Sequence, residues 1–543
     1  MCGIFCFLSE NNSENDIDNN ILLNEFDKLS GRGPDNKEFK IIENNIERNN
    51  KIIFGFHRLK INDMTDLGNQ PMYLNDCSLI CNGEIFNYED IKFKNNYITK
   101  SKSDCEIILF EYERYGIFEL CKNLDAEFAF VLYDKTQDII YAARDAFGVR
   151  PLFKGVDEKG NIYFSSEIKG ISNLCINIER FPPGCYWNSK KKDYTRYYEY
   201  IYPIARINET EEEICKNIKD LLIKAVDKRL MSDRPIGCLL SGGLDSSLIC
   251  SITNKLFKEK NKGVLNTFSI GMPGSTDLQY ALLVSKHLGT KHHNIEVSVE
   301  DFLKAIPEVI YSIESYDTTT VRASVGNYLV GKYIKENTDL TVIYNGDGSD
   351  EQSGYLYLKN APNEDDFQNE CIDLLKNIHM FDCLRSDRTI SSKWSLESRT
   401  PFLDKDFVNY YMSIQPSKKM YSKDKIEKYL LRKSFEHDNY LPVEVLWRKK
   451  EAFSDGCSSP ENSWNKIIKS YVDTIISDEE FEVEKKKFTH NMPEIKESLY
   501  YRLIFEKYYS NHSNVIDFFW MPKWCGKQTD PSARVLNIYN NSI

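Results

Sequence analysis

The sequence has no long hydrophobic run and no cysteine pair of the C-x-x-C type, although it holds 15 Cys in 543 residues. A membrane span needs about 18 or more apolar residues in a row, so the chain is expected neither to cross nor to anchor in a bilayer. An odd number of scattered cysteines argues against a disulfide framework or a structural zinc site. The N-terminus also lacks the basic flank of a signal peptide, which favours a cytoplasmic protein.

The sequence also has fewer basic than acidic residues. The chain carries 70 Lys and Arg against 82 Asp and Glu, a net charge of −12, and it has no basic tail or basic-aromatic stripe. Nucleic acid is therefore not expected as a partner. An anionic substrate would need a local cluster of Lys and Arg to bind it.

The length predicts more than one domain, because single hydrophobic cores stop growing below this size. The first 200 residues contain short apolar runs punctuated by turns, which predicts an α+β domain of stacked sheets. From Glu209 onward helical and strand patterns alternate, which predicts an α/β domain built on an open, doubly wound parallel sheet. We expect domains at residues 2–200 and 209–543, with a linker at 194–208.

The residue that follows the initiator Met is Cys2. Once Met1 is removed, this residue carries both a thiol and a free α-amino group with a reference pKa of about 7.7–8.0. The amine can then serve as general base for its own thiol, through one water, whereas a lysine would stay protonated. Cys2 is therefore a candidate nucleophile, although on its own it could equally be a small residue at the start of a strand.

The motifs that accompany Cys2 favour the nucleophile. They are MCGIF at the start, GRGPD at 31–35, FHRLKIND at 56–63, CNGEIFN at 81–87, SKSDCE at 101–106 and RDAFGVRPLF at 144–153. Together they resemble the N-terminal-nucleophile glutamine amidotransferase domain over the first 200 residues. The resemblance implies an αββα fold that releases ammonia from glutamine.

Each motif has a chemical task in that interpretation. The Asn82 side-chain amide and the Gly83 N–H can bind the oxyanion that forms on the glutamine carboxamide. Arg58 suits the α-carboxylate of glutamine, and Asp104 with Glu84 suits its α-ammonium. The predicted glutamine-binding set is Arg58, Leu59, Lys60, Ile61, Asn62, Asn82, Gly83, Glu84 and Asp104. The family usually has His where this chain has Gly31, and we expect looser packing there.

The string CLLSGGLDSS at 238–247 follows a predicted strand and precedes a predicted helix. Its glycines allow backbone N–H groups to approach phosphate, its serines can donate hydroxyls, and the helix N-terminus favours an anion. It lacks the ending of a Walker loop and resembles the pyrophosphatase-type loop of enzymes that form AMP and pyrophosphate. A second Gly-Lys spacing, GNYLVGKY at 326–333, lies in a helical pattern without a preceding strand and is rejected.

The remaining motifs extend the resemblance to the glutamine-hydrolysing asparagine synthetase family, through about Phe505. They are FSIGMPGSTDL at 268–278, HLGTKHH at 287–293, YDTTTVRAS at 316–324, NGDGSDE at 345–351, LESRTPFLD at 396–404 and WRKKEAFSDG at 447–456. The family implies an adenine-nucleotide α-hydrolase-like C-terminal domain. It also suggests a homodimer.

This resemblance assigns the second set of site residues. ATP is expected at Leu240, Ser241, Gly242, Gly243, Asp245, Ser246, Ser247, Ile270, Asn345 and Gly346. Aspartate is expected at Thr319, Thr320 and Arg322, and Lys450 is expected to face the α-phosphate. Asp245 and Asp350 suit Mg²⁺, which takes one or two carboxylates together with phosphate oxygens.

Two departures from the family lie next to these residues. The catalytic Glu of the family is replaced by Asp347, one methylene shorter, and a misplacement of about 1 Å can cost roughly a hundredfold in rate. The following segment, DEQSGYLY, is one residue shorter than usual and lacks a second glycine.

The predicted reaction converts ATP, aspartate, glutamine and water to AMP, diphosphate, asparagine and glutamate, through a cysteinyl thioester and a β-aspartyl-adenylate. Two alternatives remain open. One is a related amidotransferase or a β-lactam-synthetase-like enzyme that acts on another carboxylate. The other is a degenerate regulatory protein that binds ATP or glutamine.

Overall fold

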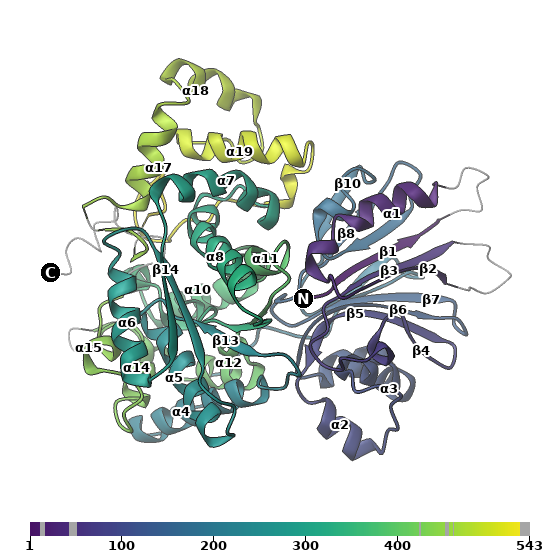
Figure 1. The fold of residues 1–543 in the computed structure, drawn as a ribbon, viewed down its shortest axis with the longest axis horizontal. Coiled ribbons are helices and arrows are strands. Elements are labelled where there is room, and N and C mark those ends of the chain that lie inside the picture. The colour runs from purple at the N-terminus through teal and green to yellow at the C-terminus, as the bar shows by residue number, and fades with distance from the viewer. Residues whose placement is uncertain (11–16, 43–50, 423–424, 451–455, 460, 533–543) are drawn as a thin grey trace. The chain divides into compact units, whose positions relative to one another are not determined.

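The computed structural model describes residues 1–10, 17–42, 51–422, 425–450, 456–459 and 461–532. These residues form two compact units (Figure 1). Unit 1 comprises Met1–Glu199, Met231–Pro235 and Ile390–Glu397, and unit 2 comprises Tyr200–Leu230, Ile236–Thr389 and Ser398–Ile543. The first long segment of unit 1 thus ends inside the predicted linker, and two short segments from later in the chain also belong to unit 1.

Unit 1 contains two six-stranded sheets. The first has the strand order β10 (Asn177–Arg180), β8 (Phe153–Val156), β9 (Ile162–Ser165), β1 (Gly3–Leu8), β3 (Ile52–Arg58) and β2 (Asn36–Ile42). The second has the order β12 (Asp193–Arg196), β11 (Cys185–Asn188), β7 (Ile139–Arg144), β6 (Ala126–Asp134), β5 (Cys77–Ile85) and β4 (Met72–Leu74). Each pair of neighbouring strands in these two sheets is antiparallel.

The two sheets of unit 1 stack face to face. One core cluster combines Ile4, Phe54 and Phe164 of the first sheet with Val131 and Trp187 of the second. On the outer face of the second sheet, a further cluster packs against the helices α2 (Tyr88–Asn95) and α3 (Ile107–Asn123). Helix α1 (Asn19–Asp27) covers the first sheet through Phe26. The layers are therefore helix, sheet, sheet and helix. The apolar runs predicted the stacked sheets, and the resemblance implied the four-layer order.

Unit 2 is built on a five-stranded sheet. Its strand order is β15 (Lys291–Glu296), β14 (Asn266–Gly271), β13 (Ile236–Leu239), β16 (Val342–Tyr344) and β17 (Glu397–Arg399). The pairs β13–β14, β13–β16 and β14–β15 are parallel. Because β13 is central and its neighbours come later in the chain on both sides, the chain winds outward in both directions, as predicted for a doubly wound sheet.

Helix α4 (Glu211–Lys228) precedes the first of these strands. The connecting helices are α5 (Leu244–Glu259), α6 (Thr276–Leu288), α7 (Val299–Ile313) and α8 (Thr318–Asn337). Helix α4 begins with a capping box between Thr210 and Glu213, which explains why the acidic start of this segment predicts a helix so well. The rejected Gly-Lys segment at 326–333 lies inside α8.

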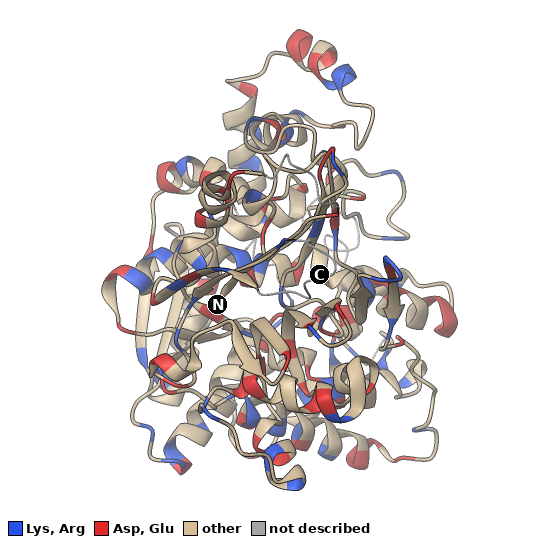
Figure 2. Ribbon diagram, turned by 90° about the vertical axis from the view of Figure 1, so that its right-hand side faces the viewer, with Lys and Arg blue, Asp and Glu red and all other residues tan. Residues whose placement is uncertain are grey.

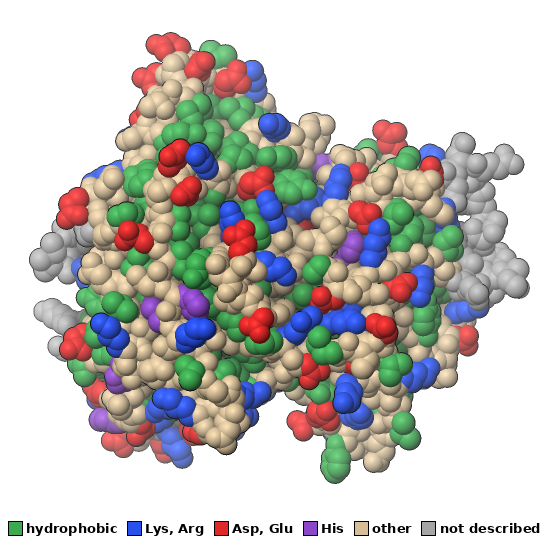
Figure 3. All heavy atoms as spheres, viewed as in Figure 1, with side chains coloured by type: hydrophobic (Ala, Val, Ile, Leu, Met, Phe, Trp, Pro, Cys, Tyr) green, Lys and Arg blue, Asp and Glu red, His purple; other side chains and the backbone are tan. Residues whose placement is uncertain are grey.

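The later part of unit 2 adds shorter helices. They are α9 (Asp350–Ser353), α10 (Glu364–Asn377), α11 (Asp382–Ser391), α12 (Lys405–Met412), α13 (Pro416–Lys419), α14 (Tyr429–Ser434), α15 (Val443–Leu446), α17 (Trp464–Asp473), α18 (Asp478–Glu484) and α19 (Lys496–Tyr508). Within the described ranges, no helix is both long enough and apolar enough to cross a membrane. Acidic and basic residues are both scattered over the ribbon and over the face shown as spheres (Figures 2 and 3).

The expectation of loose packing at Gly31 is wrong. A Cβ atom at this position would lie 2.1 Å from the Ser392 carbonyl oxygen, and Ser395 Oγ donates a hydrogen bond of 2.7 Å to the Gly31 carbonyl. The next residue, Arg32, is fully buried and pairs with Glu167 at 2.6 Å. The missing side chain is therefore required for the close approach of segment 390–397, which the sequence pattern did not predict.

Candidate active sites

The first candidate site lies in unit 1 around Cys2, near the start of β1, the end of β3 and the second half of β5. Cys2 is partly buried just before β1. Its Sγ accepts a hydrogen bond from the Leu59 N–H at 3.4 Å. Burial raises the pKa of the thiol to about 11, against the lowering effects of the chain's α-amino group and of Leu59. At neutral pH the thiol therefore needs a base before it can attack a carbonyl carbon.

Asn82 faces the same pocket from β5. It is completely buried, yet neither Nδ2 nor Oδ1 has a hydrogen-bond partner among the described residues. A buried amide without partners is costly, about 1–3 kcal/mol, and such groups are rare outside functional sites. The next residue, Gly83, has no room for a side chain, because a Cβ would lie 2.7 Å from the Glu127 carbonyl oxygen.

The acidic side of this pocket is held together by Asn62. Its Nδ2 donates to Glu84 at 2.7 Å and to Asp104 at 3.2 Å. The second oxygen of Asp104 accepts the Ile85 N–H at 2.7 Å. Two adjacent buried carboxylates create a site for a small cation such as an ammonium group.

Arg58 enters the pocket from the end of β3. Its guanidinium donates to the carbonyl oxygen of Thr65 and to Asn69 Oδ1, both at 2.7 Å, and also to the Asp63 carbonyl oxygen. Gly68 packs directly against it, since a Cβ there would lie 2.3 Å from Nη2. The loop after β3 thus fixes the position of this cation in the pocket wall.

The structure brings most of the predicted glutamine-binding residues together. Eight of the nine line the pocket: Arg58, Leu59, Ile61, Asn62, Asn82, Gly83, Glu84 and Asp104. Lys60 does not, because its Nζ contacts the Met64 carbonyl and Asp66 instead. The cavity volume of this pocket is about 30 Å³. Sequence reasoning assigned no role here to Glu397, which lies in the motif LESRTPFLD at 396–404 and also lines this pocket.

The second candidate site is a cavity of about 250 Å³ in unit 2. It lies at the carboxyl end of β13, where the loop 240–243 leads into α5. Ser241 and Ser246 close this loop, since Ser246 Oγ accepts the Ser241 N–H at 3.1 Å and lies 2.9 Å from Ser241 Oγ. Ligand sites of open parallel sheets lie at this edge.

Two glycines allow the backbone of this loop to pack closely against neighbouring backbone. Gly242 has a φ of +75°, and a Cβ there would lie 2.5 Å from the Ala281 backbone nitrogen. A Cβ at Gly346 would lie 2.6 Å from the Ser246 backbone nitrogen. Neither position therefore tolerates a side chain without moving the loop.

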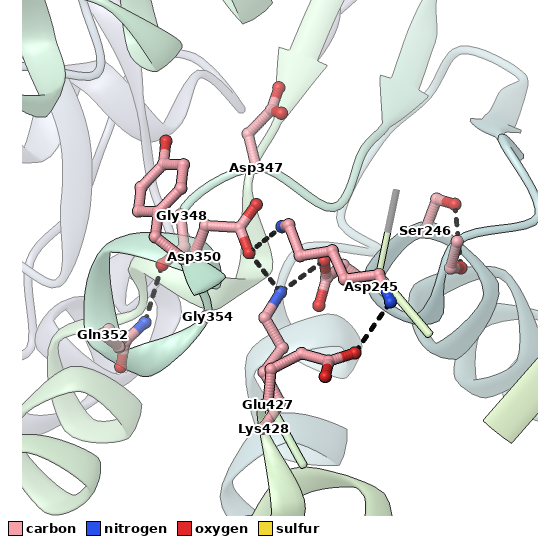
Figure 4. A network of polar contacts seen from close by, with 12 residues as sticks. Asp245, Ser246, Asp347, Gly348, Asp350, Gln352, Gly354, Glu427 and Lys428 are labelled. Atoms are coloured by element: carbon pink, nitrogen blue, oxygen red, sulfur yellow. Dashed lines mark hydrogen bonds and ion pairs between the residues drawn. The ribbon is translucent and has the colours of Figure 1, made fainter. Parts of the chain in front are cut away.

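Two lysines and two carboxylates meet at the cavity floor (Figure 4). Lys428 Nζ lies 2.5 Å from Asp245 Oδ2 and 2.6 Å from Asp350 Oδ1, and Lys450 Nζ also contacts Asp350. Burial acts to raise the pKa of Asp350, but the two lysines lower it well below its ordinary value. Asp350 is therefore ionised, and the local cations that the net charge of the chain required are present.

Asp347 points away from this cluster (Figure 4). Its carboxylate pairs with Arg385 of α11, which also contacts Asp382 at 2.6 Å. Burial raises the pKa of Asp347 to about 6, opposed by Arg385. The shorter side chain is thus held at the cavity wall by a cation from a distant helix.

The structure places most of the predicted residues of the second site at this cavity. Its wall includes Leu240, Ser241, Gly243, Asp245, Ser246, Ile270, Thr319, Arg322, Asn345, Gly346, Asp347, Asp350 and Lys450. Gly242, Ser247 and Thr320 are not part of the wall. Thr320 Oγ1 instead donates to Asp317 at 2.7 Å, in the N-cap of α8.

Several wall residues were missed by sequence reasoning. Lys428, Arg385 and Tyr355 come from segments without a phosphate-binding pattern. The C-terminal segment, which the motifs did not reach, contributes Trp520, Pro522, Pro531 and Ser532. Other wall residues without a predicted role do lie inside the motifs quoted above, among them Asp277, Glu351, Arg448 and Lys449.

Comparisons with known proteins agree with this division. Residues 1–182 match the family model for the glutamine amidotransferase domain, and residues 217–370 and 353–529 match the model for asparagine synthase. The glutamine-hydrolysing asparagine synthetase of Gallus gallus is 42% identical over 95% of this chain and 96% of its own length. The human protein of that name is 41% identical over 95% of this chain, and a probable one from Acanthamoeba polyphaga mimivirus is 41% identical over 99%.

The relatives span nearly the whole chain, and both family models fall on the units that hold the two candidate sites. The chain belongs to the family of glutamine-hydrolysing asparagine synthetases.

Proposed function

We propose that the chain makes asparagine from aspartate, ATP and glutamine, with glutamate, AMP and diphosphate as the other products. The observation that carries this proposal is the presence of two separate sites of complementary chemistry in one chain. One holds a thiol beside an unpartnered buried amide, and the other holds a phosphate-type loop beside two lysines.

The first site is proposed to release ammonia. In the structure, which includes Met1, the Cys2 nitrogen belongs to a peptide bond, so removal of Met1 is required to free the amine that takes the thiol proton. Cys2 Sγ then attacks the side-chain carbonyl carbon of glutamine, and the oxyanion is held by Asn82 Nδ2 and the Gly83 N–H. The C–N bond breaks, ammonia leaves with the proton, and water later hydrolyses the thioester to glutamate.

The contacts of the first site support recognition of glutamine as an amino acid. Arg58 is a buried cation in the wall, suited to the α-carboxylate, and the Glu84–Asp104 pair is suited to the α-ammonium. This arrangement resembles the N-terminal-nucleophile hydrolases, in which a sandwich of two sheets carries the nucleophile at its first residue. We assign unit 1 to that fold.

The second site is proposed to activate aspartate. An oxygen of its β-carboxylate attacks the α-phosphorus of ATP, the bond to diphosphate breaks, and ammonia then displaces AMP from the acyl carbon. Lys450 and Lys428 offset the negative charge that develops on the phosphates. We assign unit 2 to the adenine-nucleotide α-hydrolase-like fold on its parallel sheet and phosphate loop.

Asp245 and Asp350 fit Mg²⁺. Their carboxylates approach one cation, Lys428 Nζ, and Asp245 Oδ1 is buried without a hydrogen-bond partner in the described part of the chain. No group of three or more potential metal ligands occurs among the described residues, which suits an ion that keeps phosphate oxygens as ligands. When bound, Mg²⁺ would neutralise charge on the leaving diphosphate.

Aspartate is proposed to lie at the start of α8, beside Thr319 and Arg322. Asp347 replaces the catalytic Glu of the family and is the substitution that most threatens the activity. Its ion pair with Arg385 keeps Asp347 in the cavity wall, which favours an active enzyme over a degenerate binding protein. A cytoplasmic location and a homodimer remain predictions.

One assay tests the proposal. Purified protein is incubated with glutamine, aspartate and Mg-ATP, and asparagine and diphosphate are measured together. Equal amounts of both products are expected, and Cys2→Ala should abolish the use of glutamine while ammonia-dependent synthesis continues. Glutamine hydrolysis without aspartate-dependent diphosphate would contradict the proposal.

A further inference from the structure

Helix α8 contributes one of its faces to the wall of the 250 Å³ cavity. The wall residues on this helix are Thr319, Arg322, Ala323, Asn327 and Val330. Their spacing of three or four residues places them on one side of the helix. At a rise of about 1.5 Å per residue, Asn327 lies roughly 12 Å along the axis from Thr319. The two residues therefore line different parts of the cavity.

The part of the wall around Asn327 is apolar. Helix α8 packs against β14, and the Tyr333 ring on α8 lies edge-on to the Phe268 ring on β14, with 6.5 Å between the centroids. Side chains two residues apart share one face of a strand, so Ile270 faces α8 as Phe268 does. Phe268, Ile270 and Val330 all line the cavity. This end of the cavity therefore offers aliphatic and aromatic surface, which suits a flat base.

This apolar end lies next to the phosphate-type loop. The loop 240–243 follows β13, and β14 is the strand paired with β13, in the register Leu239 to Phe268. Neighbouring strands are about 4.8 Å apart. When the phosphates of a nucleotide bind at the loop, its base can therefore reach the surface formed by β14 and α8.

Asn327 is a polar side chain in this apolar surface. It is 8% exposed, and its amide makes no hydrogen bond to the described part of the chain. The nearby wall residue Ser269 is already occupied, since its Oγ donates to Asn294 at 3.0 Å and lies 3.1 Å from a ring nitrogen of His292. Asn is also unfavourable inside a helix, and a buried amide without partners is costly. The Asn327 amide is thus available to a ligand in the cavity.

The chemistry of an amide matches one feature of adenine. The amide of Asn327 offers a donor, Nδ2, beside an acceptor, Oδ1. Adenine presents its 6-amino donor beside a ring-nitrogen acceptor, and asparagine pairs with these two atoms in base recognition. A neutral amide in an apolar wall therefore fits the base of ATP better than its phosphates.

We propose that Asn327 selects adenine as the base of the nucleotide, with Oδ1 accepting from the 6-amino group and Nδ2 donating to the ring nitrogen beside it. The inference rests on the proposed function and adds a specificity-determining residue to its ATP site. Asn327 lies in the segment GNYLVGKY at 326–333, which was rejected as a phosphate loop. The segment thus contributes to nucleotide binding through the base and not through the phosphates.

The test compares wild type with Asn327→Leu and Asn327→Gln, using ammonia as the nitrogen source and diphosphate release as the readout. Leucine has nearly the shape of asparagine without the amide, and glutamine keeps the amide one methylene further out. The nucleotides are the Mg²⁺ complexes of ATP and of purine riboside triphosphate, which lacks the 6-amino group. In Asn327→Leu the KM for ATP should rise about five- to a hundredfold, the size expected for loss of a paired contact to a base. The kcat should change less than about twofold, because the base lies away from the reacting atoms.

The preference for ATP over the analogue is the decisive quantity, measured as the ratio of the two kcat/KM values. It should fall at least about threefold in Asn327→Leu and be partly restored in Asn327→Gln. Equilibrium binding of the two nucleotides without aspartate should show the same loss of preference. Asn337→Leu is the matched control, because Asn337 is exposed at the end of the same helix and its Nδ2 donates to the Tyr333 carbonyl oxygen. This control should leave the KM for both nucleotides unchanged.

Two results would overturn the proposal. One is an unchanged KM for ATP in Asn327→Leu. The other is an equal rise in the KM for ATP and for the analogue, because the amide would then not contact the 6-amino group. If wild type binds ATP but releases no aspartate-dependent diphosphate, the proposed function fails, whereas the binding measurement still decides the role of Asn327.

Discussion

Asn82→Ala tests the first site most directly, because the Asn82 side chain has no hydrogen bond to lose within the described protein. The substitution removes one donor to the proposed oxyanion and leaves Gly83 in place. Loss of one such donor costs about 10²–10³ in kcat, or roughly 2.7–4 kcal/mol of transition-state stabilisation. Because the donor acts mainly in the transition state, the KM for glutamine should change little.

The assay measures glutamate formation from glutamine and, separately, asparagine formation from ammonia. Glutaminase kcat should fall by at least a hundredfold, whereas ammonia-dependent synthesis should stay within about twofold. Ser78→Ala is the matched control, since Ser78 lies on the same strand β5, is buried and has a hydroxyl without a described partner, but does not line the pocket. A fall in glutaminase activity of less than about tenfold, or an equal effect of the control, would refute the role given to Asn82.

Three further predictions concern packing and charge. Gly346→Ala should lower diphosphate formation more than tenfold and spare glutaminase activity, because the new Cβ would lie 2.6 Å from the Ser246 nitrogen; loss of both activities would contradict this. Gly31→Ala should cost about 1–3 kcal/mol of stability, because its Cβ would lie 2.1 Å from the Ser392 carbonyl oxygen. The measurement is a lower Tm, and an unchanged Tm would show that the packing is loose after all. Burial lowers the pKa of Lys419 to about 8, below the 10.5 of the exposed group. Between these two pH values the folded state binds fewer protons than the unfolded state. The contribution of Lys419 to the free energy of unfolding therefore rises with pH across that range. Lys419→Met should therefore raise the Tm near pH 7, by an amount that shrinks as pH rises from about 8 to 10.5; a pH-independent effect would contradict the assignment.

Local patterns predicted the elements that hold each reactive group. The phosphate-type loop was placed between a strand and a helix, and it lies between β13 and α5. The Gly-Lys segment at 326–333 was rejected because it is helical, and it lies in α8. Such predictions succeed because a turn, a cap or an amphipathic face is decided by residues a few positions apart.

The sequence by itself thus determined the family, the two-unit division and a set of site residues, most of which line the two pockets. Only the tertiary structure decided their partners. Asp530 reaches Arg322, Arg385 reaches Asp347 and Lys428 bridges Asp245 and Asp350 across long stretches of chain. The physical reason is that ion pairs and close backbone contacts depend on distances in space. For residues far apart in the sequence, the number of residues between them does not predict that distance.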